Sequence, residues 1–122
     1  MKLLICEDNN LSLKVMEHKL KRDGFEVVTA SDGKIASSIL REQKIDFLIT
    51  DLHMPYVSGL DLIKLVRDKL KQNIPIIMIS IDSFDENILM AFEMGADDYI
   101  TKPFDSQELS VRVKHQLFKY QK

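Results

Sequence analysis

Residues 47–70, FLITDLHMPYVSGLDLIKLVRDKL, hold one complete strand–loop–helix unit. The run at 47–50 is short and apolar and ends at Asp51, which is typical of a strand buried on both faces of a parallel sheet. Pro55 and Gly59 mark the loop that follows. Apolar residues then recur at helical spacing, at Leu62, Ile63, Val66 and Leu70. The segment therefore predicts a buried strand joined by a loop to an amphipathic helix.

The same alternation continues in both directions along the chain. Further strands are predicted at residues 3–6, 27–30, 75–79 and 99–101. Further helices are predicted around residues 13–20, 35–40, 88–94 and 109–117, and Gly24 and Gly95 are typical helix ends. These repeats predict an α/β fold of the flavodoxin-like (βα)5 type. We expect a doubly wound, five-stranded parallel sheet in the order 2-1-3-4-5, with helices on both faces.

Length and composition agree with a single globular domain over residues 1–122. The chain is 45% hydrophobic and 30% charged, which excludes a disordered, collagen-like or disulfide-scaffold protein. Its 17 basic and 19 acidic residues give a net charge of −2, so we expect no direct binding of nucleic acid. One cysteine, Cys6, and an N-terminus without an apolar signal region favour a cytoplasmic protein that does not contact the membrane.

Polar residues follow four of the predicted strands at the point where each strand ends. They are Glu7 and Asp8, Asp51, Ser80 and Lys102. Because the carboxyl ends of parallel strands meet at one edge of the sheet, these side chains should converge there. Three carboxylates in one place need cations, and ligands that are all oxygen favour Mg²⁺, or Mn²⁺ in its place. A metal, an ammonium and a hydroxyl together form a clamp for a phosphoryl group, with a carboxylate as acceptor.

Each of these residues also has a simpler interpretation. Asp8 is well placed to cap the first helix, Asp51 to cap its loop, and Lys102 to be a solvated surface lysine. Cys6 fits the core of a strand. The histidines lack metal-ligand spacing and are expected at the surface: His18, His53 and His115. The joint occurrence of five such residues at the ends of four strands nevertheless favours a site.

Four segments carry a resemblance to a known family: ICEDN at 5–9, DLHMPYVSGLDLI at 51–63, IPIIMIS at 74–80 and GADDYITKPF at 95–104. Together they make the sequence similar, over essentially its whole length, to the receiver domain of two-component response regulators. The resemblance implies a domain that signals in a phosphorelay and is not a conventional turnover enzyme. Its implied partner is a sensor histidine kinase or a phosphotransfer protein.

The resemblance also implies a role for each site residue. Asp51 corresponds to the phosphoacceptor, which takes a phosphoryl group from a phosphohistidine in a Mg²⁺-dependent reaction. Glu7 and Asp8 correspond to the acidic pair of the metal site, in which Asp8 is a direct ligand and Glu7 acts largely through water. Asp51 and the backbone carbonyl of His53 correspond to the other protein ligands. Lys102 corresponds to the residue that pairs with the phosphoryl group, and in the family the proline after it, here Pro103, is usually cis.

A switch is implied as well. Ser80 corresponds to the switch hydroxyl and Tyr99 to the switch aromatic, which together repack the surface of the fourth helix, fifth strand and fifth helix. We expect this surface to bind partners or to form a homodimer, in which charged residues either pair between copies or are simply solvated: Asp97, Asp98, Arg112, Lys114 and Lys119. Ile81 stands where the family usually has a small residue, so it should slow reactions at Asp51. Asp82 and His53 are expected to tune hydrolysis of the phosphoryl group.

Three other functions remain to be compared with this one. The chain fits equally well the N-terminal receiver of a longer, DNA-binding transcriptional regulator. A phosphatase with an aspartyl-phosphate intermediate would need an acid two residues after Asp51, where His53 stands instead. A flavin carrier would need a phosphate-binding loop after the first strand, and Glu7 and Asp8 would repel that phosphate.

Overall fold

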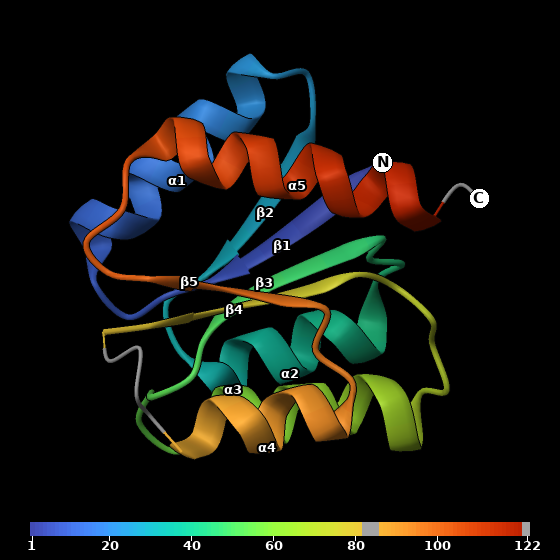
Figure 1. The fold of residues 1–122 in the computed structure, drawn as a ribbon. Helices are drawn as coiled ribbons and strands as arrows, with labels where there is room; N and C mark the ends of the chain where they lie inside the picture. Colours follow the sequence, from blue (N-terminus) through green and yellow to red (C-terminus); the bar gives the residue numbers. More distant parts are fainter. Residues whose placement is uncertain (82–85, 121–122) are drawn as a thin grey trace.

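Strands and helices alternate along the described part of the chain, residues 1–81 and 86–120, in a computed structural model (Figure 1). The strands are β1 (Lys2–Cys6), β2 (Glu26–Ala30), β3 (Phe47–Asp51), β4 (Ile76–Ser80) and β5 (Asp98–Thr101). The α-helices are α1 (Asn10–Arg22), α2 (Gly33–Glu42), α3 (Gly59–Lys64), α4 (Glu86–Met94) and α5 (Ser106–Tyr120). Each predicted element is therefore present, with bounds shifted by a few residues.

The strands form one parallel sheet in the order β2-β1-β3-β4-β5, which confirms the predicted topology. Helices α1 and α5 cover one face of the sheet, and α2, α3 and α4 cover the other (Figure 1). From β1 the chain adds β2 on one side and β3, β4 and β5 on the other, so the direction in which strands are added reverses between β1 and β3. In sheets of this kind, ligands bind at that point, outside the carboxyl ends of the strands.

The continuous apolar runs supply two separate cores because successive side chains of a strand point to opposite faces. In β1, Leu3 and Ile5 pack beneath α1 and α5, whereas Leu4 and Cys6 pack against α2 and α3. β3 and β4 divide their side chains in the same way. Burial on both faces explains why these strands contain hardly any polar residues before their last position.

Helix ends follow local sequence signals, with one correction. Asn9, not Asp8, caps α1: its side-chain oxygen accepts the Ser12 amide at 2.9 Å. The capping interpretation of Asp8 is therefore wrong. Gly24, at φ +97°, follows α1 in the left-handed conformation that a glycine end requires.

The helix predicted to run through Leu70 is also corrected. α3 ends at Lys64 and continues as a π-helical turn, η1 (Leu65–Lys69), in which the Leu70 amide bonds to the Leu65 carbonyl. Arg67 in this turn donates to the Gly95 carbonyl at the end of α4, and to Asp97. Tyr120, the last described residue of α5, donates to the same Asp97 carboxylate at 3.0 Å. These contacts tie three helix ends together at the edge of the sheet opposite the strands' carboxyl ends.

Candidate functional site

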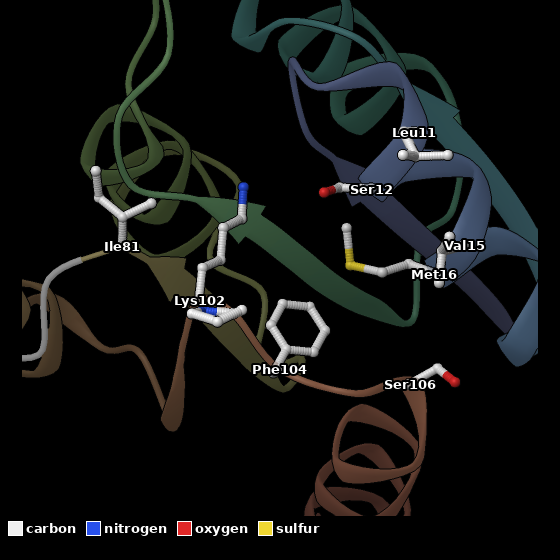
Figure 2. Close-up of a pocket in the computed structure, with 9 residues that line it drawn as sticks. Leu11, Ser12, Val15, Met16, Ile81, Lys102, Phe104 and Ser106 are labelled. Atoms are coloured by element: carbon white, nitrogen blue, oxygen red, sulfur yellow. The ribbon is translucent and has the colours of Figure 1, made fainter.

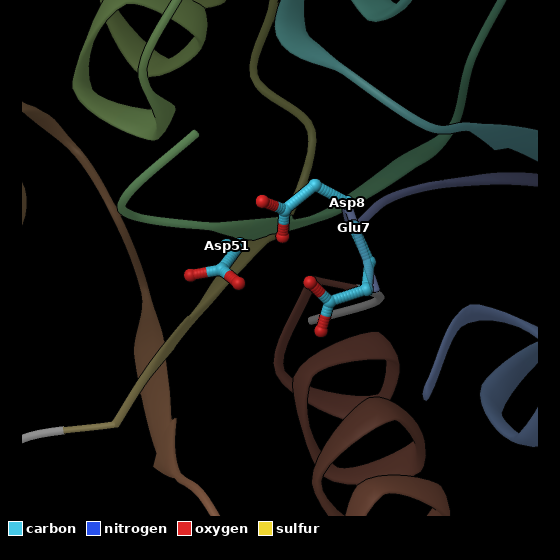
Figure 3. Close-up of side chains that lie close together, drawn as sticks. All are labelled: Glu7, Asp8 and Asp51. Carbon is cyan, nitrogen blue, oxygen red and sulfur yellow. The ribbon is translucent and has the colours of Figure 1, made fainter. Parts of the chain in front are cut away.

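Three carboxylates converge at the carboxyl edge of the sheet, between β1 and β3. One oxygen from each of Glu7, Asp8 and Asp51 lies within 4.8 Å of the others. Figure 3 shows the three side chains directed toward a common space. The edge position predicted from the sequence is thus correct for all three acids.

Asp51 occupies the last position of β3 and is only 7% exposed. Its Oδ1 accepts the backbone amide of His53 at 3.3 Å, and its Oδ2 accepts the Lys102 ammonium at 3.1 Å. The two interactions fix the plane of the carboxylate. Asp51 therefore caps its own loop, as the simpler interpretation expects, and also belongs to the charged site.

Lys102 follows β5 and directs its ammonium between two acidic groups. It bonds to Glu7, which is completely buried, and to Asp51. Burial alone would lower the pKa of Lys102, but the hydrogen bond to Glu7 and the charge of Asp51 outweigh it and raise the pKa above its usual value. The ammonium stays charged, so the interpretation of Lys102 as a solvated surface lysine is wrong.

One positive charge does not balance three acids. Desolvation of the Asp8 carboxylate, together with the hydrogen bond and charge of Glu7, raises the pKa of Asp8. A divalent cation would relieve this repulsion, and a set of oxygen ligands suits Mg²⁺. The donor set of Glu7, Asp8 and Asp51 therefore fits a hard metal ion.

The two residues expected to act as a switch lie on neighbouring strands. Ser80 ends β4 and is fully buried, and its carbonyl accepts the Lys102 amide at 2.7 Å. Tyr99 lies on β5, half-buried, with its ring edge-on to Phe92 of α4 at a centroid distance of 5.9 Å. Ser80 is thus joined to the Lys102 backbone, and Tyr99 contacts the helix whose surface it is expected to repack.

The residues expected to tune the site differ in position. His53 is exposed and lies in the loop after β3, two residues from Asp51. Ile81 directly follows β4 and is 74% exposed. Asp82 lies outside the described residues.

Sequence reasoning missed how closely the loop between β3 and α3 is packed. A Cβ atom on Gly33 would lie 2.0 Å from the Val57 carbonyl oxygen, and one on Gly59 would lie 2.3 Å from the Asp51 carbonyl oxygen. On the other side, the Cys6 thiol lies 3.2 Å from the Met54 sulfur. Burial raises the pKa of Cys6 to about 12, so the thiol stays neutral and acts as core. The glycines at the starts of α2 and α3 were the only available signal of this packing.

An apolar groove of about 570 Å³ borders the charged site. It is lined by Leu11, Ser12, Val15, Met16, Ile81, Lys102, Pro103, Phe104 and Ser106. Figure 2 shows Leu11 and Ile81 on opposite sides, with the Lys102 ammonium between them. Lys102 therefore belongs to both the groove and the acidic site.

Comparison with known proteins decides the family to which this arrangement belongs. A family model described as the response regulator receiver domain matches residues 3–114. The chain belongs to this family. Receiver domains are regulatory rather than conventional enzymes, and they interact with histidine kinases or phosphotransfer proteins.

Two curated relatives come from Bacillus subtilis (strain 168). The uncharacterized transcriptional regulatory protein YcbL is 35% identical over 111 residues, which are 91% of this chain and 48% of that protein. The alkaline phosphatase synthesis transcriptional regulatory protein PhoP is 34% identical over 113 residues, 93% of this chain and 47% of that protein. This receiver domain thus spans about half the length of the curated relatives it matches.

Solved structures agree with the fold. The receiver domain of the Francisella response regulator 1452 superposes with a TM-score of 0.88 at 34% identity, covering 99% of this chain and 98% of that one. The receiver domain of a Pseudomonas aeruginosa PAO1 sensor histidine kinase superposes with a TM-score of 0.83 at 25% identity, covering 94% and 95%. That structure holds a magnesium ion in its active site cleft. Among the described residues of the present chain, no helix has the length and apolar character of a membrane span.

Proposed function

We propose that this receiver domain, residues 1–122, accepts a phosphoryl group on Asp51 from the phosphohistidine of a sensor histidine kinase or phosphotransfer protein. An Asp51 carboxylate oxygen forms the new bond to phosphorus while the bond from phosphorus to the histidine nitrogen breaks. The nitrogen keeps the electron pair of that bond. The carboxylate is suited to this attack because its two contacts, to the His53 amide and the Lys102 ammonium, fix its orientation.

The acidic residues and Lys102 have different electrostatic roles in the proposed transfer. Glu7, Asp8, Asp51 and the backbone carbonyl of His53 would hold Mg²⁺, with Mn²⁺ as a substitute, and the metal would neutralise charge on the phosphoryl oxygens. Glu7 is buried and bonded to Lys102, so it also keeps the ammonium beside Asp51. Lys102 then stabilises the charge that develops on the transferred group.

The same groups support a switch. A phosphoryl group adds about −1.5 to −2 charge units and acceptor oxygens at Asp51. Ser80, at the end of the neighbouring strand, would donate a hydrogen bond to it, and Tyr99 would turn into the space that Ser80 leaves. This change repacks the α4–β5–α5 surface for partner binding or dimerisation by shifting an existing equilibrium. The domain assists its own phosphorylation and dephosphorylation and works in the cytoplasm, with Ile81, Asp82 and His53 setting the rates.

The observation that carries the proposal is the contact of the Lys102 ammonium with Asp51 inside a cluster of three carboxylates. The test is incubation with Mg²⁺ and phosphoramidate, followed by intact mass spectrometry. We expect the wild type to gain the mass of one phosphoryl group, and a chelator to prevent it. Asp51→Asn, which keeps the size of the side chain, should gain none. An unmodified wild type, or a modified Asp51→Asn, would refute the assignment.

A second proposal concerns the whole protein. The names of two curated relatives contain "transcriptional regulatory protein", and this chain covers 48% and 47% of them. These similarities favour the N-terminal receiver of a DNA-binding regulator, in which this domain itself makes no DNA contact. The reading frame beyond codon 122 tests the idea, because a frame that encodes no further domain would contradict it.

A further inference from the structure

The tip of the loop between β3 and α3 has an unusual backbone conformation. Tyr56 has φ +70°, and the amide of the next residue, Val57, bonds to the carbonyl of the preceding residue, Pro55, at 2.8 Å. This is a three-residue turn with a positive φ at its centre, a strained arrangement that bulky side chains rarely adopt. Its occurrence five residues after Asp51 therefore calls for a physical reason.

Packing of the Tyr56 side chain within the domain does not explain this backbone conformation. The side chain is 90% exposed, so its ring buries little apolar surface within the domain. The turn, by contrast, is held firmly on both sides. Its flanks are fixed by the contact of Val57 with Gly33, the contact of Met54 with Cys6, and the bond from the Gly59 amide to the Leu52 carbonyl. A well-fixed turn thus presents a tyrosine ring to the outside.

Two other side chains are exposed around the same edge. Among the described residues, the three most exposed large hydrophobic side chains are Tyr56 at 90% and Leu11 and Ile81 at 74% each. They follow β3, β1 and β4, the three strands whose ends surround Asp51. Leu11 and Ile81 flank the groove that contains Lys102 (Figure 2). An exposed apolar side chain therefore follows each of these three strands, and two of the three lie beside Lys102, which contacts Asp51.

We propose that Tyr56 is a docking contact for the phosphodonor protein and helps to determine which donor this domain accepts. The inference rests on the proposed function of Asp51. Asp51 is 7% exposed, and in-line transfer requires reacting atoms about 3–3.5 Å apart, so a protein donor must bring its surface down onto the surrounding side chains. The histidine-bearing face of the donor would have an apolar patch that covers Tyr56, with Leu11 and Ile81 on the groove side. Aromatic residues are well suited to such contacts because they bury a large rigid area.

The experiment compares protein and small-molecule donors. The probe is a purified, autophosphorylated sensor histidine kinase from the same genome, chosen as the one that phosphorylates the wild type fastest. We expect Tyr56→Asn to lower kcat/KM for this transfer about 10-fold, mainly through KM, because asparagine tolerates the left-handed turn but removes the ring. Tyr56→Phe should transfer like the wild type, and phosphoramidate should modify all variants at equal rates. Arg41→Asn, a change at an exposed residue in the last turn of α2 and outside the groove, is the control and should have no effect.

The outcomes separate this inference from the proposed function. Equal kcat/KM for the wild type and Tyr56→Asn with the kinase would overturn the docking role while leaving Asp51 as acceptor. A slower reaction of Tyr56→Asn with phosphoramidate would also overturn it, because the effect would then lie in the loop geometry. Failure of every kinase to phosphorylate a wild type that phosphoramidate modifies would overturn the assignment of a protein donor. A wild type that neither donor modifies would refute the proposed function itself.

Discussion

Replacing Gly59 by alanine tests how closely the loop between β3 and α3 packs against the backbone of Asp51. The added Cβ would lie 2.3 Å from the Asp51 carbonyl oxygen and 2.9 Å from the Leu52 Cα, both of them backbone atoms that cannot swing aside. Reaching ordinary van der Waals contact requires a displacement of about 1 Å, and overpacking of this kind costs about 1–3 kcal/mol. Alanine gains up to about 1 kcal/mol of helix preference over glycine, but Gly59 is the first residue of α3, where that gain is smallest. We therefore expect a net loss of about 1–2 kcal/mol in the free energy of unfolding.

Urea denaturation followed by circular dichroism measures this loss, and calorimetric titration with Mg²⁺ measures the effect on the site. Because the displaced atoms belong to Asp51 and Leu52, Gly59→Ala should also bind Mg²⁺ more weakly. The matched control is Gly24→Ala, since a Cβ there meets nothing within 4 Å and only the left-handed backbone is strained. That control should lose about 1 kcal/mol of stability and keep the Mg²⁺ affinity. A Gly59→Ala protein as stable as the wild type would contradict the close-packing argument. It would show that the gain in helix preference is at least as large as the cost of the steric overlap.

Three further changes test other parts of the structure. Ile81→Ala, at the edge of the groove beside Lys102, should speed phosphorylation by phosphoramidate or hydrolysis of the acyl phosphate; two unchanged rates would contradict the blocking role. Arg67→Met should destabilise the domain by about 2 kcal/mol in urea denaturation, because the charge-assisted hydrogen bonds to the end of α4 are lost; a loss below about 0.5 kcal/mol would mean that water replaces them. Ser110→Ala removes the 2.6 Å hydrogen bond that lowers the pKa of Asp23, so it should cost about 1–2 kcal/mol at pH 7. The difference from the wild type should shrink as the pH falls through the lowered pKa of Asp23, below its usual value of about 4, because that stabilisation exists only while the carboxylate is charged; a difference independent of pH would exclude this cause.

The topology could be predicted from the sequence because it depends on simple periodicities. Apolar runs of about five residues alternate with helical spacing, and the carboxyl ends of parallel strands must share one edge. The convergence of Glu7, Asp51 and Lys102 follows from these two facts and from nothing else. The prediction needs only the position of each residue at the end of its strand, and not the exact placement of its side chain.

Features that depend on contacts between distant segments could not be predicted. The π-helical turn at Leu65–Lys69 leaves no mark on the apolar spacing, although it carries Arg67, which bonds to the end of α4. The positive φ of Tyr56 contradicts the preference of its side chain, so local propensity predicts the opposite. The choice between Asp8 and Asn9 as helix cap likewise depends on a shift of one residue. Asp8 is directed to the carboxylate cluster, and only the three-dimensional structure distinguishes these two positions.

The charged residues expected to join two copies of this domain are largely paired within one copy. Arg112 donates to both oxygens of Asp98, at 2.9 and 3.1 Å, while Asp97 accepts from Arg67 and Tyr120. A homodimer that paired Asp98 with Arg112 between copies would exchange an existing ion pair for an equivalent one, so its electrostatic gain would be close to zero.

The driving force for association through this surface must then come from apolar side chains. The exposed ones on α4 and α5 are Leu89, Met90, Phe92, Val111 and Phe118. Tyr99 packs edge-on against Phe92, so a change of the Tyr99 rotamer alters that apolar surface directly and leaves the internal ion pairs intact. Phosphorylation at Asp51 would thus control partner binding through hydrophobic packing, and the salt dependence of dimerisation should be weak. Strong weakening of a phosphorylation-dependent dimer between low and high salt in analytical ultracentrifugation would contradict this reasoning.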